Sequence, residues 1–127
     1  MNQTLIHTAY QQAKEADNYE IGRRFEQYIV KLFNEQFFYL KKWRKSEKFG
    51  NFSLPIDHWN PDIEMELVFT KKTFRFAVEC KWRSKFRKGK INWAKDHQIC
   101  NYRMFQDRTR IPVFVAIGIG GEPDNRE

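Results

Sequence analysis

The stretch Phe76-Ala77-Val78-Glu79-Cys80-Lys81-Trp82 places an apolar side chain at every second position. This period of two is typical of a half-buried β-strand. A second stretch, Asp62–Phe69, alternates in the same way, and the polar residues Thr70–Thr73 separate it from Phe74–Trp82. The sequence therefore predicts an antiparallel hairpin of two strands, Asp62–Phe69 and Phe74–Trp82, around which the rest of the chain is arranged.

The hairpin has one apolar and one charged face, because opposed side chains in an antiparallel pair point the same way and the apolar rows must coincide to be buried. The apolar face would hold Ile63, Met65, Leu67, Phe69, Phe74, Phe76, Val78, Cys80 and Trp82. The other face would hold Asp62, Glu64, Glu66, Arg75, Glu79 and Lys81. The turn length places Asp62 opposite Glu79 or Lys81, within a residue or two.

Two carboxylates at that end of the hairpin need a counter-charge. At about 4 Å they repel by roughly 4 kcal/mol for an effective dielectric constant near 20. A proton, Lys81 or a bound cation could neutralise them, and a divalent ion held by one or two carboxylates, water and phosphate is a common arrangement. The alternative is a solvated strand face with an ordinary Glu–Lys pair.

Composition indicates one basic domain over residues 1–127. Its 23 lysines and arginines exceed its 16 acidic residues by seven, and 12 Phe with 4 Trp argue against disorder. A net charge of +7 predicts a polyanionic partner, nucleic acid before a membrane.

No targeting signal is visible at the start of the chain. The longest strongly apolar run, Val113–Ile117, is too short to cross a bilayer. Cys80 is expected to be a small buried side chain, and neither it nor Cys100 has metal-ligand spacing. A single disulfide between the two cysteines is left as an alternative. We expect a cytoplasmic protein that does not interact with membranes.

Two helices are expected before the hairpin, Thr4–Ala16 and Ile21–Gln36, separated by a capping box at Asp17–Glu20. Residues 1–18 would then form a helical extension. Glu26 lies at the margin of the apolar stripe of the second helix, where it either faces solvent or reaches the acidic end of the hairpin.

The remaining elements follow from the same patterns. They are a first strand Phe37–Trp43 beside the hairpin, a loop 44–60, a helix Ile91–Arg108 with Gln98 and Tyr102 on one stripe, a fully buried and hence parallel strand Ile111–Ile119, and a frayed tail 122–127. Asp57 and His58 in the loop are interpreted as surface residues rather than a metal or catalytic pair. The abrupt end after the last strand is compatible with a trimmed chain.

A basic segment, Arg83–Lys90, follows the hairpin. Five of its eight residues are cationic, and Lys85, Arg87, Lys88 and Lys90 are the candidates for contact with a phosphate backbone. A solvated turn explains the same composition.

The charged and polar residues singled out above, together with their spacing, resemble the motifs of the PD-(D/E)xK nuclease superfamily, whose fold is restriction-endonuclease-like. Pro61-Asp62 stands 17 residues before Glu79-Cys80-Lys81 on the adjacent strand, and an acid, Glu26, lies in the preceding helix. Gln98-x-x-x-Tyr102 resembles the RecB-like branch, and Val78-Glu-Cys-Lys81 resembles the Mrr-type and Holliday-junction-resolvase branches. The resemblance covers roughly Tyr19 to Gly121 and implies an α/β fold with an αβββαβ core and a mixed central sheet flanked by helices.

The resemblance also implies roles. Asp62, Glu79 and the backbone carbonyl of Cys80 would hold Mg²⁺ or Mn²⁺, with Glu26 as a direct or outer ligand. Lys81 would orient or deprotonate the attacking water, Gln98 would bracket the site through a hydrogen bond, and Tyr102 would pack or contact phosphate. Glu64 is a substitute ligand, and Glu20 a more distant one that helix capping explains better.

The function this implies is metal-dependent hydrolysis of phosphodiester bonds in DNA, with a homodimer left open. The alternative is a basic nucleic-acid-binding module of the same fold without catalysis. Hydrolysis with Mg²⁺ or Mn²⁺ separates the two.

Overall fold

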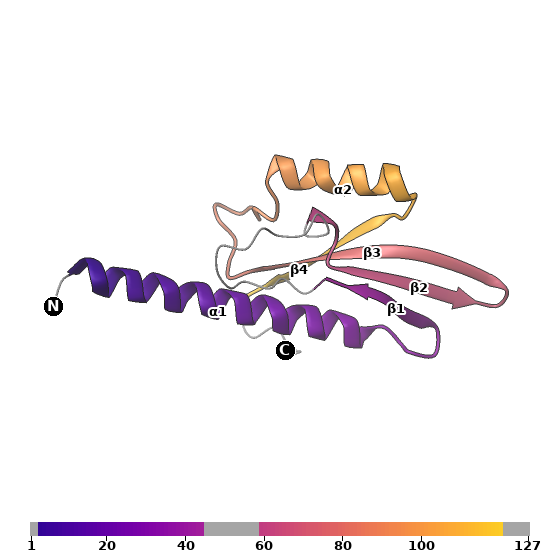
Figure 1. Cartoon of the computed structure of the whole chain (residues 1–127), viewed down its shortest axis with the longest axis horizontal. Coiled ribbons are helices and arrows are strands. Elements are labelled where there is room, and N and C mark those ends of the chain that lie inside the picture. Colours follow the sequence, from indigo (N-terminus) through magenta and orange to yellow (C-terminus); the bar gives the residue numbers. More distant parts are fainter. Residues whose placement is uncertain (1–2, 45–58, 121–127) are drawn as a thin grey trace.

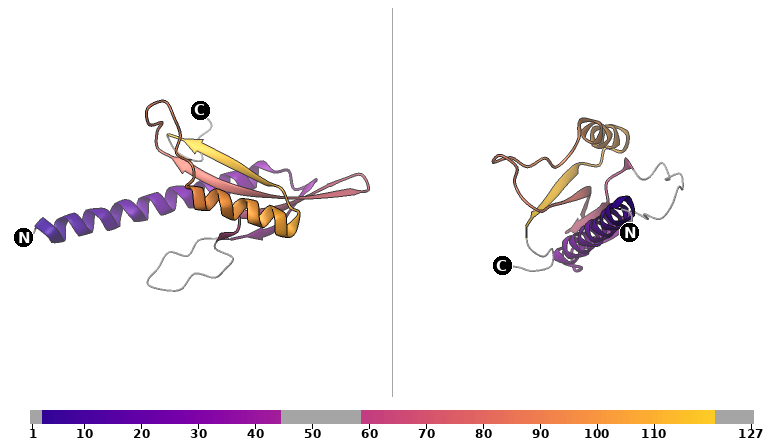
Figure 2. Two further views of the ribbon diagram at one scale, coloured as in Figure 1. Left: turned by 90° about the horizontal axis from the view of Figure 1, so that it is seen from above. Right: turned by 90° about the vertical axis from the view of Figure 1, so that its left-hand side faces the viewer.

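The computed structural model describes residues 3–44 and 59–120, with side chains from residue 18 onward. It is an α/β structure in which a four-stranded mixed sheet, in the order β1-β2-β3-β4, lies between two helices (Figure 1). The elements in chain order are α1 (Gln3–Leu32), β1 (Phe38–Trp43), β2 (Ile63–Phe69), β3 (Lys72–Arg83), α2 (Asp96–Thr109) and β4 (Val113–Ile119). Further views show α1 and α2 on opposite sides of the sheet (Figure 2).

The central hairpin forms in the predicted register. Ile63 opposes Val78, Met65 opposes Phe76, and Leu67 opposes Phe74, so the apolar rows coincide. The turn is shorter than predicted, because Phe69 and Lys72 already pair and leave only Thr70 and Lys71 between the strands. Thr70 adopts the left-handed backbone conformation (φ 56°) that such a tight connection requires.

The first helix differs from the prediction. A single helix, Gln3–Leu32, replaces the two helices that a capping box was expected to separate. Glu20 does not cap a helix start; it accepts hydrogen bonds from Arg23 one turn further on, a pairing that supports a continuous helix. The helix also ends earlier than Gln36, because the carbonyl of Asn34 accepts hydrogen bonds from the N–H groups of Phe37 and Phe38 in a turn that leads into β1.

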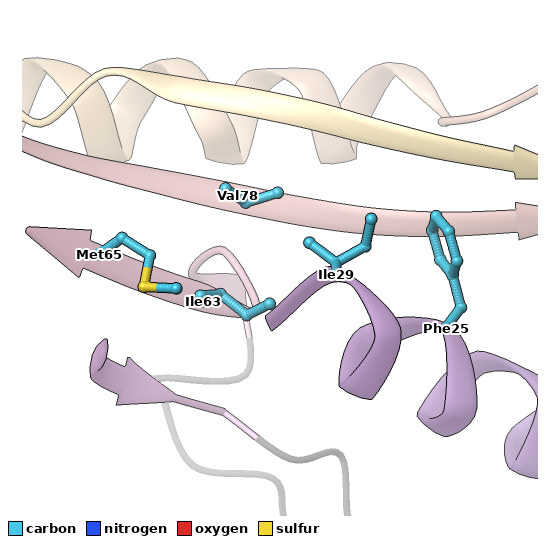
Figure 3. Packing of buried hydrophobic residues seen from close by; sticks show 5 residues of the cluster. All are labelled: Phe25, Ile29, Ile63, Met65 and Val78. Atoms are coloured by element: carbon cyan, nitrogen blue, oxygen red, sulfur yellow. The ribbon is translucent and has the colours of Figure 1, made fainter. Parts of the chain in front are cut away.

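The face of the hairpin that α1 covers is the hydrophobic core. Phe25 and Ile29 of α1 point onto Ile63, Met65 and Val78 of the two strands, as Figure 3 shows. Each such side chain contributes about 1.5–3 kcal/mol when fully buried. This packing fixes α1 against β3, and with it the position of Glu26, which follows Phe25 in the helix.

The parallel pairing of β4 with β3 is confirmed, with Val78 opposite Phe114 and Cys80 opposite Ala116. The prediction that this strand is fully buried is wrong. The strand β4 lies at the edge of the sheet, and Phe114 exposes 58% of its surface. Position 118 is glycine for a steric reason, since a Cβ there would lie 2.4 Å from the ring of Trp82.

The second helix begins at Asp96, five residues later than the predicted Ile91. The side chain of Gln98 accepts a hydrogen bond from the N–H of Lys95 at 2.8 Å, which caps the helix at that point. Gln98 thus marks the first turn of α2 rather than the middle of a longer stripe. Tyr102 and Phe105 are buried beneath the helix, as its apolar stripe predicted.

Candidate active site

A cleft of about 650 Å³ opens among α1, the sheet and α2. It collects residues from both helices, from β3 and from the residues just before β2. The predicted site residues that line it are Glu26 from α1, Asp62 beside β2, Glu79, Cys80 and Lys81 from β3, and Gln98 and Tyr102 from α2. The sequence pattern therefore identified residues that the fold brings to one place.

Asp62 stands just before the first residue of β2, where the hairpin ladder ends. Because Ile63 opposes Val78, the next position places Asp62 beside Glu79. The N–H of Cys80 donates a hydrogen bond of 2.9 Å to Oδ2 of Asp62, and Asp62 also shares a hydrogen bond with Glu79. The preceding Pro61 is fully buried, so the backbone that carries Asp62 is firmly packed.

The two carboxyl groups are an electrostatically costly pair. Burial raises the pKa of Asp62 well above its usual range, and the hydrogen bond and negative charge of Glu79 raise it further. The charge of Glu26 acts in the same direction, while the Cys80 N–H partly opposes it. A shared proton at Asp62 and Glu79 therefore satisfies the site unless a cation takes its place.

Glu79 is held from two sides. It is buried at 7% exposure, and the Nζ atom of Lys81 lies 4.0 Å from its Oε2 atom. The hydroxyl of Tyr102 also shares a hydrogen bond with Glu79, and burial together with this contact raises the pKa of the tyrosine. Tyr102 is itself buried, so the structure places it as a support of Glu79, on the cleft wall.

Glu26 reaches the site from α1. Its Oε1 atom accepts a hydrogen bond of 3.4 Å from the indole N–H of Trp43 at the end of β1. This contact holds the carboxylate near the sheet, where its charge acts on Asp62. The sequence-based alternative of a fully solvent-facing Glu26 does not hold, because its side chain is only partly exposed.

The donor atoms at this end of the hairpin fit a hard divalent cation. Asp62 and Glu79 offer carboxylate oxygens, and the carbonyl of Cys80 is directed to the same side of β3 as its N–H, toward Asp62. Within residues 3–44 and 59–120 there is no preformed group of three or more His, Cys, Asp or Glu side chains able to hold a metal ion. A site at this position would thus use two carboxylates, which is the usual number for Mg²⁺ in a site completed by water and phosphate.

Glu64, the substitute ligand suggested by the sequence, is used elsewhere. It is buried and forms an ion pair with Arg44, whose guanidinium also donates to the carbonyl of Pro61 at 2.7 Å. The same guanidinium lies 5.8 Å from the ring centre of Phe105 in α2. The Glu64–Arg44 ion pair therefore connects β2 with the end of β1 and with α2. Glu64 does not line the cleft.

The basic segment after β3 forms an ordered turn beside the cleft. Arg87 and Lys90 exchange backbone hydrogen bonds of 2.8 and 2.9 Å, and Lys88 and Gly89 between them both have positive φ, the pattern of a tight hairpin turn. The side chains predicted to contact nucleic acid, Lys85, Arg87, Lys88 and Lys90, are exposed. They lie outside the cleft lining, which the segment reaches through Arg83 and Ser84.

Several residues that line the cleft were not singled out from the sequence as site residues, among them Trp59, His97 and Asn101. Trp59 is 65% exposed at the cleft, and His97 and Asn101 line it from α2. None carries a motif, and their placement depends on how α2 and the residues before Pro61 pack, so no local pattern could have found them. The Asp57-His58 pair lies outside the described residues.

Both cysteines are free, Cys100 exposed and Cys80 packed beside the core. Burial and the neighbouring carboxylates raise the pKa of the Cys80 thiol, which therefore stays protonated and has no role as a nucleophile. Cys80 contributes to the site through its backbone.

No helix within residues 3–44 and 59–120 has the length and apolar character needed to span a membrane. Comparison of the chain with models of protein families, with curated proteins and with solved structures finds no match. The geometry and chemistry of the cleft are therefore what indicate a function.

Proposed function

We propose that this protein is a metal-dependent nuclease that hydrolyses phosphodiester bonds in DNA, built on a restriction-endonuclease-like core of the PD-(D/E)xK type. The observation that carries the proposal is the pairing of half-buried Asp62 with buried Glu79, with Lys81 at 4.0 Å from Glu79, in a cleft open to solvent. The raised pKa of Asp62, caused by burial and by the neighbouring charge of Glu79, is costly to maintain, and such perturbed groups concentrate at functional sites.

The surrounding elements support the same reading. The order α1, β1, β2, β3, α2, β4, with β4 parallel to β3, matches the αβββαβ core that the motif resemblance implies. Glu26 in α1 acts on the same carboxyl group from the other side of the cleft. These features come from separate parts of the chain, so their convergence does not follow from one short motif.

Asp62, Glu79 and the Cys80 carbonyl would hold Mg²⁺ or Mn²⁺, with Glu26 nearby as a direct or outer ligand. When bound, the ion would supply Lewis acidity and a lowered pKa of water. Lys81 would orient the attacking water and offset negative charge that develops on the phosphate. Tyr102 would keep Glu79 in position, and Gln98 would fix the first turn of α2 at the edge of the cleft.

DNA is the proposed partner, since the net charge is +7 and an exposed cationic turn lies beside the cleft. A cytoplasmic location agrees with this partner. The second candidate, a DNA-binding module without catalysis, is favoured by one observation: the cationic side chains of residues 85–90 are exposed outside the cleft and could bind a phosphate backbone without the acid pair.

Cleavage assays decide between the two. The purified chain is incubated with supercoiled plasmid, single strands and a four-way junction, with and without Mn²⁺. We expect Mn²⁺-dependent cleavage of at least one substrate that is abolished in Asp62→Asn and retained in Glu66→Gln, a matched change on the same strand. Binding with no metal-dependent cleavage of any substrate would establish the module instead.

A further inference from the structure

Among residues 3–44 and 59–120, β4 pairs with β3 on one side and with no strand on its other side. It lies at one end of the strand order, and its sequence Val-Phe-Val-Ala-Ile-Gly-Ile contains no charged residue and no proline. Phe114 and Ile117 on its two faces are 58% and 38% exposed. A long, apolar, uncharged edge strand is a template for pairing with another strand.

The opposite edge of the same sheet is built differently. The strand β1 contains Lys41 and Lys42, and its pairing with β2 is interrupted by an irregularity between Leu40 and Lys42. Lysines and bulges are the devices by which edge strands avoid pairing with other chains. Their presence on β1 and absence from β4 mark β4 as the edge that accepts a partner.

The backbone of β4 offers free groups in a defined register. The carbonyl of Pro112 and the N–H of Gly120 bond to β3, so the even-numbered residues face inward and the odd-numbered residues 115, 117 and 119 direct N–H and C=O outward. The N–H of Val113 already donates to the side chain of Gln106 at 2.8 Å. The outward groups that remain are the C=O of Val113 and both backbone groups of residues 115, 117 and 119, so the accessible part of the edge centres on Ala116.

The sequence of β4 is complementary to itself about that centre. In an antiparallel pair with Ala116 opposite Ala116, Val115 meets Ile117 as a hydrogen-bonded pair, and Phe114 meets Gly118. The large side chain thus lies opposite the residue without one, where the ring of Trp82 covers Gly118. We propose that β4 pairs with β4 of a second copy of this chain, which joins the two sheets into one continuous eight-stranded sheet.

An apolar groove beside this edge supports a copy of the chain as the occupant. The groove, of about 530 Å³, lies between α1 and β3–β4 and is lined by Leu32, Phe33, Phe76 and Phe114. In the two-fold arrangement both grooves lie on the same face of the joined sheet and meet at the axis. Apolar surface that each copy exposes alone is then covered by the corresponding surface of the other, as an isologous interface requires.

Sedimentation equilibrium over a wide concentration range tests the association. We expect a reversible dimer for the parent chain and a dimer dissociation constant at least about tenfold higher for Phe114→Lys, because both copies lose an aromatic cross-strand contact. Phe74→Lys is the matched control, since Phe74 is similarly exposed (55%) on β3, remote from the β4 edge. Circular dichroism checks that both variants are folded.

Disulfide formation tests the register. In a Cys80→Ala, Cys100→Ser background, which removes the thiol that lies opposite position 116 on β3, Ala116→Cys would place two thiols across the axis, with Cα atoms about 4.5 Å apart and within disulfide range. Val113→Cys is the control, because its two copies would lie about 20 Å apart. A parent chain that stays monomeric at all concentrations, or a dimer that survives Phe114→Lys and does not cross-link at position 116, would overturn the proposal.

Discussion

Replacing Asp62 with asparagine should stabilise the metal-free protein at neutral and alkaline pH. Burial and the charges of Glu79 and Glu26 raise the pKa of Asp62 above its value in the unfolded chain. The folded state therefore binds more protons than the unfolded state between those two pKa values, and its stability falls as the pH rises through that window. Above the window the full electrostatic penalty remains.

The magnitude follows from the contacts. Two carboxylates about 4 Å apart repel by roughly 4 kcal/mol at an effective dielectric constant of 20, and a shared proton removes part of this. An asparagine oxygen can still accept the hydrogen bond that the Cys80 N–H now gives to Asp62, and its amide can donate to Glu79. The neutral acceptor is weaker by about 1 kcal/mol. We expect a net gain of about 1–3 kcal/mol in the free energy of unfolding, or roughly 4–12 °C in the midpoint.

The assay is thermal and urea denaturation with a chelator present, at pH 8 and at a pH below 4. At the acidic pH both proteins carry a neutral group at position 62, so the advantage of the variant should disappear. Glu66→Gln is the matched control on the same strand. Glu66 pairs with the partly exposed Lys41 at 3.6 Å, and its replacement should change the free energy of unfolding by about 0–1 kcal/mol.

A bound divalent metal ion should make the parent chain more stable than Asp62→Asn, the reverse of the order expected without metal. A ligand at a hundred times its dissociation constant stabilises the folded state by about 2.7 kcal/mol. With saturating Mn²⁺ the parent should gain stability and Asp62→Asn should gain little. If the metal-free variant is less stable than the parent at pH 8, or if Mn²⁺ stabilises both equally, the assignment of Asp62 and Glu79 as a strained pair that binds a cation is wrong.

Three further changes test the remaining parts of the site. Lys81→Met should leave folding and Mn²⁺ binding largely intact while single-turnover cleavage falls by about 10²-fold or more; activity within a few-fold of the parent would contradict its proposed role. Neutralising Lys85, Arg87 and Lys88 together should lower the slope of log affinity for DNA against log salt by up to about 0.9 per lost phosphate contact, and an unchanged slope would show that this turn does not touch the backbone. Arg44→Met should cost up to about 3–5 kcal/mol in urea denaturation, because within residues 3–44 and 59–120 buried Glu64 keeps only the exposed Arg75, at 3.7 Å, as a cationic partner, and added Glu64→Gln should recover most of this loss; a cost below about 1 kcal/mol would show that the pair does not stabilise the fold.

The hairpin and its acid pair were predictable from the sequence because strand alternation is a local pattern. Because Ile63 and Val78 must lie opposite each other on the buried face, the next positions, Asp62 and Glu79, are also neighbours, independently of the other elements. The parallel pairing of the last strand was also accessible. Its apolar run was interpreted as a fully buried and hence parallel strand, and the parallel pairing is confirmed although the strand lies at the edge of the sheet.

The differences arise where several weak signals compete. The expected break in α1 depended on a capping pattern that stabilises a helix start by about 1 kcal/mol. The chain instead continues as one helix through Tyr19, and the Glu20–Arg23 ion pair supports this continuation. The burial of β4 could not be predicted, since an apolar strand has the same sequence pattern at an edge as at the centre of a sheet. The ion pair of Arg44 with Glu64 joins residues that only the completed sheet brings together.

The contrast between Glu64 and Asp62 is the strongest physical argument for the site. The two acids lie on the same face of the hairpin, two positions apart; Glu64 is buried and Asp62 is half-buried. Glu64 forms ion pairs with Arg44 and, at 3.7 Å, with Arg75, two cations of its own chain. The charges that act on the pKa of Asp62 are those of Glu79 and Glu26, which are negative. The chain thus supplies a counter-charge for Glu64 but surrounds Asp62 with negative charge. A proton or an external cation must therefore fill the position beside Asp62 and Glu79. Lys81 lies next to that position.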